Sequence, residues 1–212
     1  MNQQAFYFDG TRCTGCKTCE MACKDFKDLS TGTAFRKVYE VEYGTTVKDA
    51  SGCISTSCVN YSVSLSCNHC ENPACVHVCP TGAMHKDDET GLVLVSRERC
   101  VGCGYCHMAC PYNVPKVDRE KGCSVKCDGC IDRVRAGEFP VCVGACPARA
   151  LSFGPVGDME KLGERANVAP LPESFHTVPN LFVKASKDFL PADDALGKVA
   201  NLAAPWAVAA FL

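Results

Sequence analysis

Sixteen of the nineteen cysteines in this sequence fall into four runs of four. The first run, CTGCKTCEMAC, and the third, CVGCGYCHMAC, share one spacing, C-x2-C-x2-C-x3-C, whereas the second and fourth runs widen the middle gap. This spacing holds [4Fe–4S] clusters in bacterial ferredoxins, whose thiolate ligands converge on a cubane core. The runs therefore predict one-electron redox chemistry at iron–sulfur clusters. Their members are Cys13, Cys16, Cys19 and Cys23; Cys67, Cys70, Cys75 and Cys79; Cys100, Cys103, Cys106 and Cys110; and Cys127, Cys130, Cys142 and Cys146.

Ferredoxin runs work in pairs, because the last cysteine of each run ligates the cluster of the other run. The second and third runs are neighbours, separated by a turn and a short strand expected around Leu92 to Val95, and we expect them to form one inner unit. The first and fourth runs then pair around it. The predicted ligand sets are Cys13, Cys16, Cys19 and Cys146; Cys127, Cys130, Cys142 and Cys23; Cys67, Cys70, Cys75 and Cys110; and Cys100, Cys103, Cys106 and Cys79. Sequential pairing, first run with second, also fits the spacing.

Structural zinc is the competing reading of the cysteines, since zinc also binds C-x2-C pairs. It fits the fourth run best, where two short pairs flank an eleven-residue gap. Zinc there would leave Cys13, Cys16 and Cys19 without a fourth ligand. A disulfide framework is disfavoured, because nineteen is an odd number and closely spaced cysteines in ferredoxin register are badly placed to pair.

Composition and missing motifs exclude several function classes. The formal charge of -2 is intermixed along 212 residues, with no basic stripe for nucleic acid. No glycine-rich phosphate loop indicates an NAD or flavin site. None of the five histidines has the partners of a catalytic nucleophile, and His69 and His107, which lie within cysteine runs, are expected at most to hydrogen-bond around a cluster. We therefore predict no catalytic residue and no small-molecule substrate.

The segments CTGCKTCEMACKD, SCNHCENPACVHVCPTGAMHK, CVGCGYCHMACPYNVP, KCDGCIDRV, FGPVGDM and APLPESFHTVPNLFVK closely resemble the iron–sulfur subunits of the dimethyl sulfoxide reductase family of molybdopterin oxidoreductases. The resemblance covers the sequence to about Lys184. It implies a non-catalytic electron-transfer subunit with four [4Fe–4S] clusters, placed between a molybdopterin catalytic subunit and an integral membrane anchor that oxidises quinol. Equivalent subunits of formate dehydrogenase or of tetrathionate, polysulfide or arsenate reductase are the alternative within this class, and a zinc-stabilised assembly module is the alternative outside it.

Three features depart from a simple ferredoxin. Lys24 follows Cys23 where the other runs have proline, and it is expected either beside a cluster or as a solvated loop residue. Cys53 and Cys58 lie in an insertion and either form a disulfide or remain free thiols. Cys123 is expected to be a bystander near the fourth run.

The predicted fold is α+β, with two pseudo-symmetric ferredoxin-like units. Residues 1–35 and 111–155 form the outer unit, 36–66 a β-hairpin insertion with strands at Val38 to Tyr43 and Tyr61 to Leu65, 67–110 the inner unit, and 156–212 an extended C-terminal extension that docks on the body or on partner subunits. The final segment, VANLAAPWAVAAFL, is too short to span a bilayer and is expected to pack or dock, or to lie at a membrane interface.

The first residues lack a basic region followed by an apolar run, so we expect no signal peptide and assign any export to a partner subunit. Family resemblance implies a peripheral position on the bacterial cytoplasmic membrane, on the periplasmic face, with the cytoplasmic face as alternative. Four oxidised clusters, each about -2 with its thiolates, bring the net charge from -2 to about -10. We expect backbone amides and cations to offset this charge, and the metal-free protein to be largely unfolded. The expected cations are Lys17, Lys24, Lys126, Arg133 and Arg135.

Overall fold

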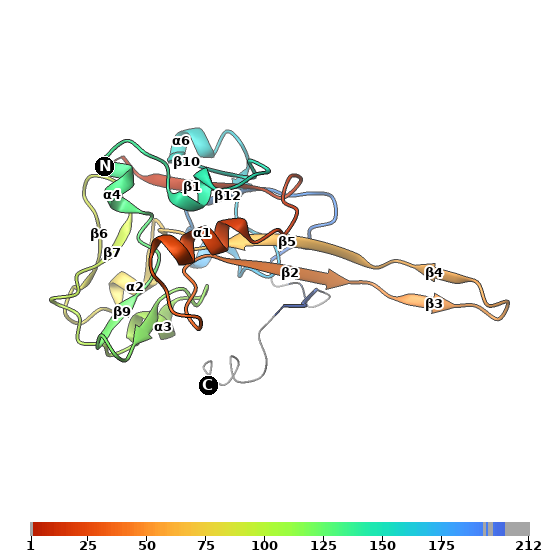
Figure 1. Ribbon diagram of the computed structural model, residues 1–212, viewed down its shortest axis with the longest axis horizontal. Coiled ribbons are helices and arrows are strands. Elements are labelled where there is room, and N and C mark those ends of the chain that lie inside the picture. Colours follow the sequence, from red (N-terminus) through yellow and green to blue (C-terminus); the bar gives the residue numbers. More distant parts are fainter. Residues whose placement is uncertain (1, 193, 195–196, 202–212) are drawn as a thin grey trace.

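The computed structural model describes residues 2–192, 194 and 197–201. It is a mixed α and β structure built from short elements, in which the nine residues of α1 (Thr18–Phe26) form the longest described helix. A compact body carries a long two-stranded arm that projects from one side (Figure 1). The apolar tail predicted at the C-terminus lies outside the described residues, apart from its first three.

A four-stranded sheet with the order β10-β1-β12-β11 supports the body. Strand β1 (Gln4–Asp9) is buried along its whole length, as expected of a central strand with apolar side chains on both faces. It pairs antiparallel with β10 (Leu151–Pro155) and parallel with β12 (Leu181–Lys184), and β11 (Glu164–Arg165) completes the sheet. The helix α6 (Val156–Met159) packs beside β1 and β10. The start of the sequence is thus enclosed by segments that come late in it.

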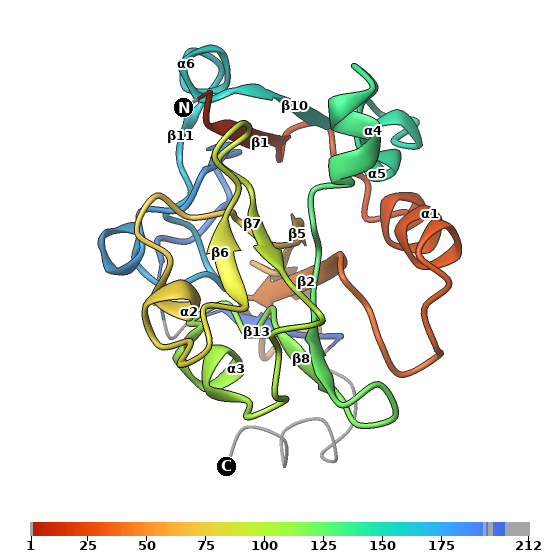
Figure 2. The ribbon, with the colours of Figure 1, turned by 90° about the vertical axis from the view of Figure 1, so that its left-hand side faces the viewer.

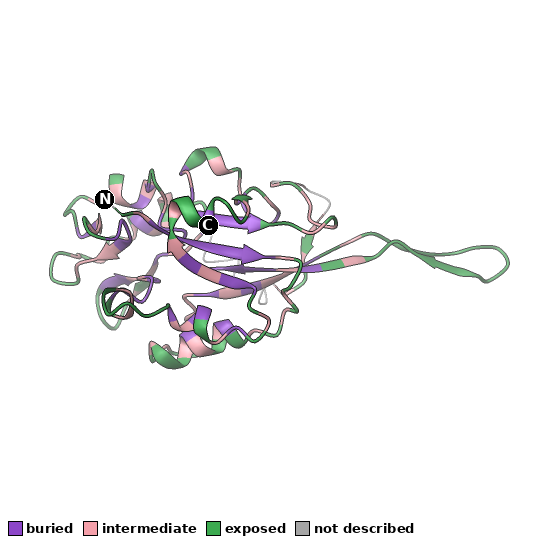
Figure 3. Ribbon diagram, turned by 90° about the horizontal axis from the view of Figure 1, so that it is seen from above, coloured by how far each residue is buried: buried purple, intermediate pink, exposed green. Residues whose placement is uncertain are grey.

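The hairpin predicted from alternating residues is confirmed. Strands β2 (Lys37–Tyr43) and β5 (Val59–Leu65) pair antiparallel over seven residue pairs, and β3 (Thr46–Lys48) and β4 (Ile54–Thr56) extend the ribbon outward. At its base the face that carries Val41, Tyr61 and Val63 is buried in the core. Every residue from 46 to 58 is exposed, and we call this segment the arm (Figure 3). After β12 the polypeptide returns to pair β13 (Lys198–Val199) with β2.

Short helices and two small hairpins frame the cysteine loops. The hairpins are β6 (Met84–Lys86) with β7 (Val93–Val95) and β8 (Lys116–Asp118) with β9 (Cys123–Val125). The helices are α2 (Ala74–His77), α3 (Tyr105–Ala109), α4 (Ile131–Arg135) and α5 (Val141–Gly144), and a 3-10 turn, η1, covers Ser174–His176. Helix α1 packs against α5, and α2 packs against α3 (Figure 2). The elements of the first run therefore meet those of the fourth, and the second meets the third.

Candidate metal centre

The four cysteine runs share one backbone feature. The residue two positions after the first cysteine has a positive φ in every run: Gly15 (68°), His69 (43°), Gly102 (66°) and Gly129 (71°). This left-handed conformation turns the backbone sharply, so that consecutive N–H groups face the sulfur atoms. Glycine occupies three of the four positions, as the conformation favours. The runs thus adopt similar loops despite their different gaps.

Two of the predicted ligand sets line hollows in the surface of the body. Cys13, Cys16, Cys19 and Cys146 surround one hollow, whose remaining wall includes Phe8 from β1. Cys79, Cys100, Cys103 and Cys106 surround a second hollow between β6 and α3. Each hollow therefore takes three cysteines from one run and the last cysteine from its partner run.

The other two sets lie deeper in the body, where sulfurs influence one another's pKa values both within each set and between the two sets. Burial raises the pKa of Cys23 to about 12, and the neighbouring Cys142 and Cys130 sulfurs act in the same direction. Burial likewise raises the pKa of Cys70 to about 12, with Cys67 and Cys110 contributing in the same direction.

The remaining members fit this division. Burial, followed by the Cys67, Cys110 and Cys70 sulfurs, raises the pKa of Cys75. The structure thus brings cysteines together in the nested pattern and does not place the first run against the second.

The four sets follow one another through the body. Cys19 of the first hollow lies near Cys142 of an interior set, whose Cys127 lies near Cys67 of the next interior set. Cys75 of that set shares an apolar cluster with Cys106 of the second hollow. Among the sixteen, only Cys16 and Cys103 are exposed, and they belong to the two end sets. The arrangement is a line with one accessible end on each side.

Backbone and hydroxyl groups lie within hydrogen-bond distance of sulfurs in both end sets and in the set with Cys127. Backbone N–H groups of Met84, Ser124, Gly129 and Ala150 lie 3.3–3.4 Å from the sulfurs of Cys79, Cys100, Cys127 and Cys146, respectively. The Ser64 and Ser124 hydroxyls lie 3.4 and 3.3 Å from Cys19 Sγ and Cys106 Sγ, which are the third cysteines of the first and third runs. Donors of this kind stabilise thiolates and the clusters they bind.

The sulfur geometry fits a cluster better than a single ion. A tetrahedral zinc site with Zn–S bonds of about 2.3 Å needs its sulfurs within roughly 4 Å of one another. In the described part of the sequence, no three Cys, His, Asp or Glu side chains are close enough to hold one metal ion. Eight of the cysteines instead line two hollows, four to each, and a four-iron cubane takes four thiolates around one such space.

His69 joins three parts of the site. Its Nδ1 accepts a hydrogen bond from the Val93 N–H at 2.9 Å, so the proton of the neutral ring is on Nε2, which lies 4.0 Å from Cys127 Sγ. Its carbonyl accepts from Asn180 Nδ2 at 2.9 Å. The second run is thereby tied to β7, to the fourth run and to the segment before β12.

The predicted cations divide into two groups. Lys126 is buried with its Nζ 3.7 Å from Cys67 Sγ. The prediction is wrong for Arg133 and Arg135, whose guanidinium groups form ion pairs with carboxylates at the surface. Lys24 does not face a cluster set, because its Nζ donates to the carbonyls of Ser30, Thr31 and Thr33 at 2.5–3.0 Å and closes the loop after α1.

Arg36 had no signal in the sequence, since it stands in the hairpin insertion, well separated from every cysteine run. In the structure its side chain is fully buried and lies close to Cys142, Cys19 and Cys127. Burial acts to lower the pKa of Arg36, but the adjacent sulfurs outweigh burial and raise it.

The three cysteines outside the runs are free thiols. Cys53 and Cys58 flank β4, and five extended steps hold them roughly 16 Å apart, far beyond disulfide reach. The disulfide alternative is therefore wrong in this structure. Cys123 is buried at the start of β9, next to Ser124, which contacts Cys106 rather than the fourth run.

Comparison with known proteins agrees with this geometry. Residues 58–156 match a 4Fe-4S dicluster domain. The sequence is 52% identical to the B subunit of the anaerobic dimethyl sulfoxide reductase of Haemophilus influenzae, over 95% of this protein and 98% of the relative. It is 50% identical to the corresponding B subunit of Escherichia coli, over 94% and 97%. It is 41% identical to the thiosulfate reductase electron transfer subunit of Salmonella typhi, over 75% and 79%.

Within the described part of the sequence, no helix combines the length and apolar character that crossing a bilayer requires. The sixteen grouped cysteines, the dicluster match and the identity to these relatives over nearly the whole length lead to one conclusion. The protein belongs to the family of iron–sulfur electron-transfer subunits of dimethyl sulfoxide reductase-type complexes.

Proposed function

We propose that this protein relays electrons through four [4Fe–4S] clusters, from a quinol-oxidising membrane anchor to a molybdopterin catalytic subunit. The observation that carries the proposal is the line of four cysteine sets with an exposed cysteine only at each end. The proposed ligands are the nested sets: Cys13, Cys16, Cys19 and Cys146; Cys23, Cys127, Cys130 and Cys142; Cys67, Cys70, Cys75 and Cys110; and Cys79, Cys100, Cys103 and Cys106.

Bound clusters supply reversible one-electron transfer. The polypeptide contributes the rest: the thiolates fix the distances between neighbouring centres, and the N–H and O–H donors stabilise the negative charge on sulfur. Burial of the interior sets keeps water and oxidants away from the middle of the line, whereas the ends stay open to partners. No group positioned for proton transfer to a substrate is needed in such a subunit.

The end with Cys103 is surrounded by exposed apolar side chains. Met108 is 71% exposed, Val101 66% and Tyr105 52%, and Val78 follows α2, which packs against α3. An apolar patch around an accessible redox end favours a protein partner at that point. We assign this face to the membrane anchor and the end with Cys16 to the catalytic subunit. By analogy with the family we propose the periplasmic face of the membrane, with the cytoplasmic face as the alternative.

The nested ligand sets are tested with Cys146→Ser. If Cys146 completes the set of the first run, the variant loses the signal of the end cluster and its iron content falls from about sixteen towards about twelve per protein molecule. Cys110→Ser is the matched variant, and it removes an interior cluster instead. Loss of the same cluster in both variants would contradict nested pairing, and about twelve irons with one zinc in the unsubstituted protein would contradict the four-cluster relay.

The partner assignment is tested on the assembled complex. Met108→Glu places a charge in the apolar patch and is expected to release the anchor while leaving the catalytic subunit bound. Phe139→Glu, at an apolar side chain that is 61% exposed elsewhere on the body, is the control. Retention of the anchor by Met108→Glu would contradict the assignment.

A further inference from the structure

Arg36 is a buried cation without a carboxylate. Its side chain is 1% exposed, and no ion pair involves it among the described residues. Its Nη atoms donate to Ser64 O and Oγ at 3.3 and 3.1 Å and to Ser66 Oγ at 2.8 Å, and the guanidinium lies 4.9 Å from the centre of the Phe6 ring. Neutral acceptors alone do not repay the burial of a full positive charge.

The negative partners of Arg36 are sulfurs. Cys142, Cys19 and Cys127 are the charged groups that raise its pKa, and the Ser64 hydroxyl that accepts from Arg36 lies 3.4 Å from Cys19 Sγ. Cys19 belongs to the end set of the first run, whereas Cys142 and Cys127 belong to the adjacent interior set. One fixed cation therefore stands between two sets of thiolates.

Lys126 repeats this arrangement between the two interior sets. Only 5% exposed, it donates from Nζ to Val93 O, to Cys127 O at 2.8 Å and to Cys67 Sγ at 3.7 Å. These three acceptors match the three N–H donors of a lysine ammonium group. No carboxylate pairs with it among the described residues.

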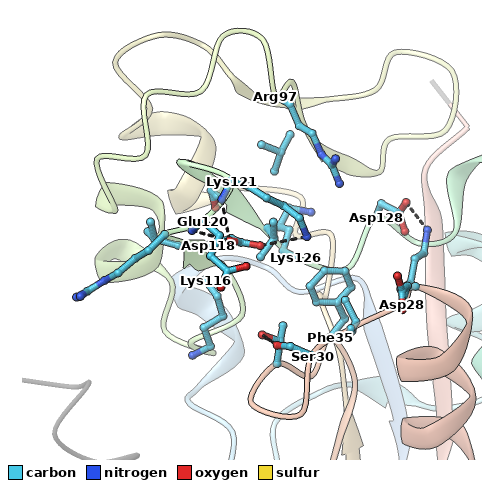
Figure 4. Close-up of a pocket in the computed structure, with 18 residues that line it drawn as sticks. Asp28, Ser30, Phe35, Arg97, Lys116, Asp118, Glu120, Lys121, Lys126 and Asp128 are labelled. Atoms are coloured by element: carbon cyan, nitrogen blue, oxygen red, sulfur yellow. Dashed lines mark hydrogen bonds and ion pairs between the residues drawn. The ribbon is translucent and has the colours of Figure 1, made fainter.

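Another lysine on the wall of the same cavity, Lys27, has a carboxylate partner, in contrast to Lys126. A space of about 740 Å³ opens between the loop after α1 and the hairpin of β8 and β9, and Lys126 forms part of its wall (Figure 4). On that wall Lys27 is neutralised by Asp128 at 2.7 Å, as is usual for a half-buried lysine. Lys126 has a sulfur where Lys27 has a carboxylate.

We propose that Arg36 and Lys126 are fixed counter-charges of the two interior clusters and raise the reduction potentials of those clusters. The inference rests on the proposed function, because it requires clusters in the cysteine sets. A reduced cluster carries one more negative charge than an oxidised one, so a nearby cation stabilises the reduced form more. Burial removes the solvent screening that weakens this effect at the surface. Electrons can therefore reduce the buried clusters in the middle of the line.

The sequence supplies a matched control in Lys17. It follows the proposed ligand Cys16 directly, as Lys126 directly precedes Cys127. However, the side chain of Lys17 is 44% exposed and its Nζ pairs with Glu40 at 2.6 Å. Screening and pairing leave it little influence on a cluster.

The test is a redox titration followed by EPR on the assembled complex, with iron and sulfide counted in each preparation. Arg36→Gln is expected to lower the reduced-to-oxidised ratio of the interior cluster ligated by Cys127 and Cys142 at least tenfold at a given solution potential, equivalent to 59 mV for one electron. Lys126→Gln is expected to do the same for the interior clusters. Arg36→Lys, which keeps the charge, restores the potential, and Lys17→Gln leaves it unchanged.

Equal shifts in Arg36→Gln and Arg36→Lys would overturn the inference, because packing rather than charge would then set the potential. Unshifted potentials in a fully loaded Lys126→Gln complex would also overturn the inference. If Arg36→Gln binds less iron than the unsubstituted complex, the inference is judged on Lys126→Gln alone. Fewer than about sixteen irons in the unsubstituted complex would defeat the proposed function itself. About sixteen irons together with unchanged cluster potentials in the variants would contradict only the role of the two cations.

Discussion

Ser124→Ala removes one hydroxyl beside one proposed cluster and leaves the backbone donor of the same residue in place. The Ser124 side chain is buried, and its Oγ accepts a hydrogen bond from the Cys106 thiol at 3.3 Å. A thiolate has no proton to give, so in the loaded protein the hydroxyl becomes the donor to this sulfur. Its N–H remains 3.3 Å from Cys100 Sγ in the variant. Alanine fills nearly the same volume, so the change is close to a pure loss of one O–H···S bond.

The expected shift follows from the energy of that bond. Hydrogen bonds to charged groups contribute about 1.5–3 kcal/mol, and we take about 0.5–1.5 kcal/mol as the part that differs between the oxidised and reduced cluster. At 59 mV for each tenfold change in a one-electron equilibrium, this difference corresponds to a potential lower by roughly 20–60 mV. The cluster ligated by Cys106 is expected to shift, and the other three are expected to keep their potentials.

The assay is EPR-monitored redox titration of the assembled complex, in which the three other clusters serve as internal controls. Iron content must equal that of the unsubstituted protein before potentials are compared. A rise in the potential of this cluster, or equal shifts of all four, would refute the reasoning. The first outcome would show that the hydroxyl does not donate to sulfur, and the second would show a general loosening of the body.

Three further outcomes are expected. Gly129→Ala is expected to lower the thermal stability of the loaded protein by more than Gly137→Ala. Both glycines have positive φ, but only a Cβ at Gly129 would meet another side chain, Leu92, at 2.8 Å. Equal melting temperatures of the two variants, followed by visible absorbance, would contradict this. Asn180→Ala leaves a buried carbonyl of the second run unpaired and is expected to cost about 1–3 kcal/mol in chemical unfolding, with a smaller loss expected for Asn201→Ala at the periphery. Replacing the arm by a short turn is expected to leave iron content unchanged, since the whole segment is exposed.

Cysteine spacing leads to the proposed nested grouping because ligand geometry leaves few solutions. A run with three-residue steps can close around one cluster only, and its last cysteine must point away. The same local reasoning predicted the hairpin at Val38 to Tyr43 and Tyr61 to Leu65, where alternation reports one buried face. The structure extends these strands by one and two residues at their ends, to Lys37 and Val59.

Contacts between residues far apart in the sequence could not be predicted from local sequence patterns. Nothing near Arg36 marks it as buried, because its neighbours Phe35 and Lys37 belong to a stretch without cysteines. Lys24 drew attention for standing where proline stands in other runs, yet three carbonyls of the following loop occupy its amine. The position of β12 beside β1 depends on a parallel pairing across more than 170 residues, which no short motif reports.

The place of β1 in the sheet has a consequence for biosynthesis. This strand leaves the ribosome well before its neighbours, which begin at Leu151 and Leu181. At about 5–20 residues per second, β1 waits roughly 10 to 35 seconds for its second neighbour. During that time its apolar side chains and unpaired edges are exposed, and Cys13 just beyond it has no fixed position. The four-stranded sheet can close only after β12 has been synthesised, so the end set of the first run, which needs Cys146, is expected to receive its iron late.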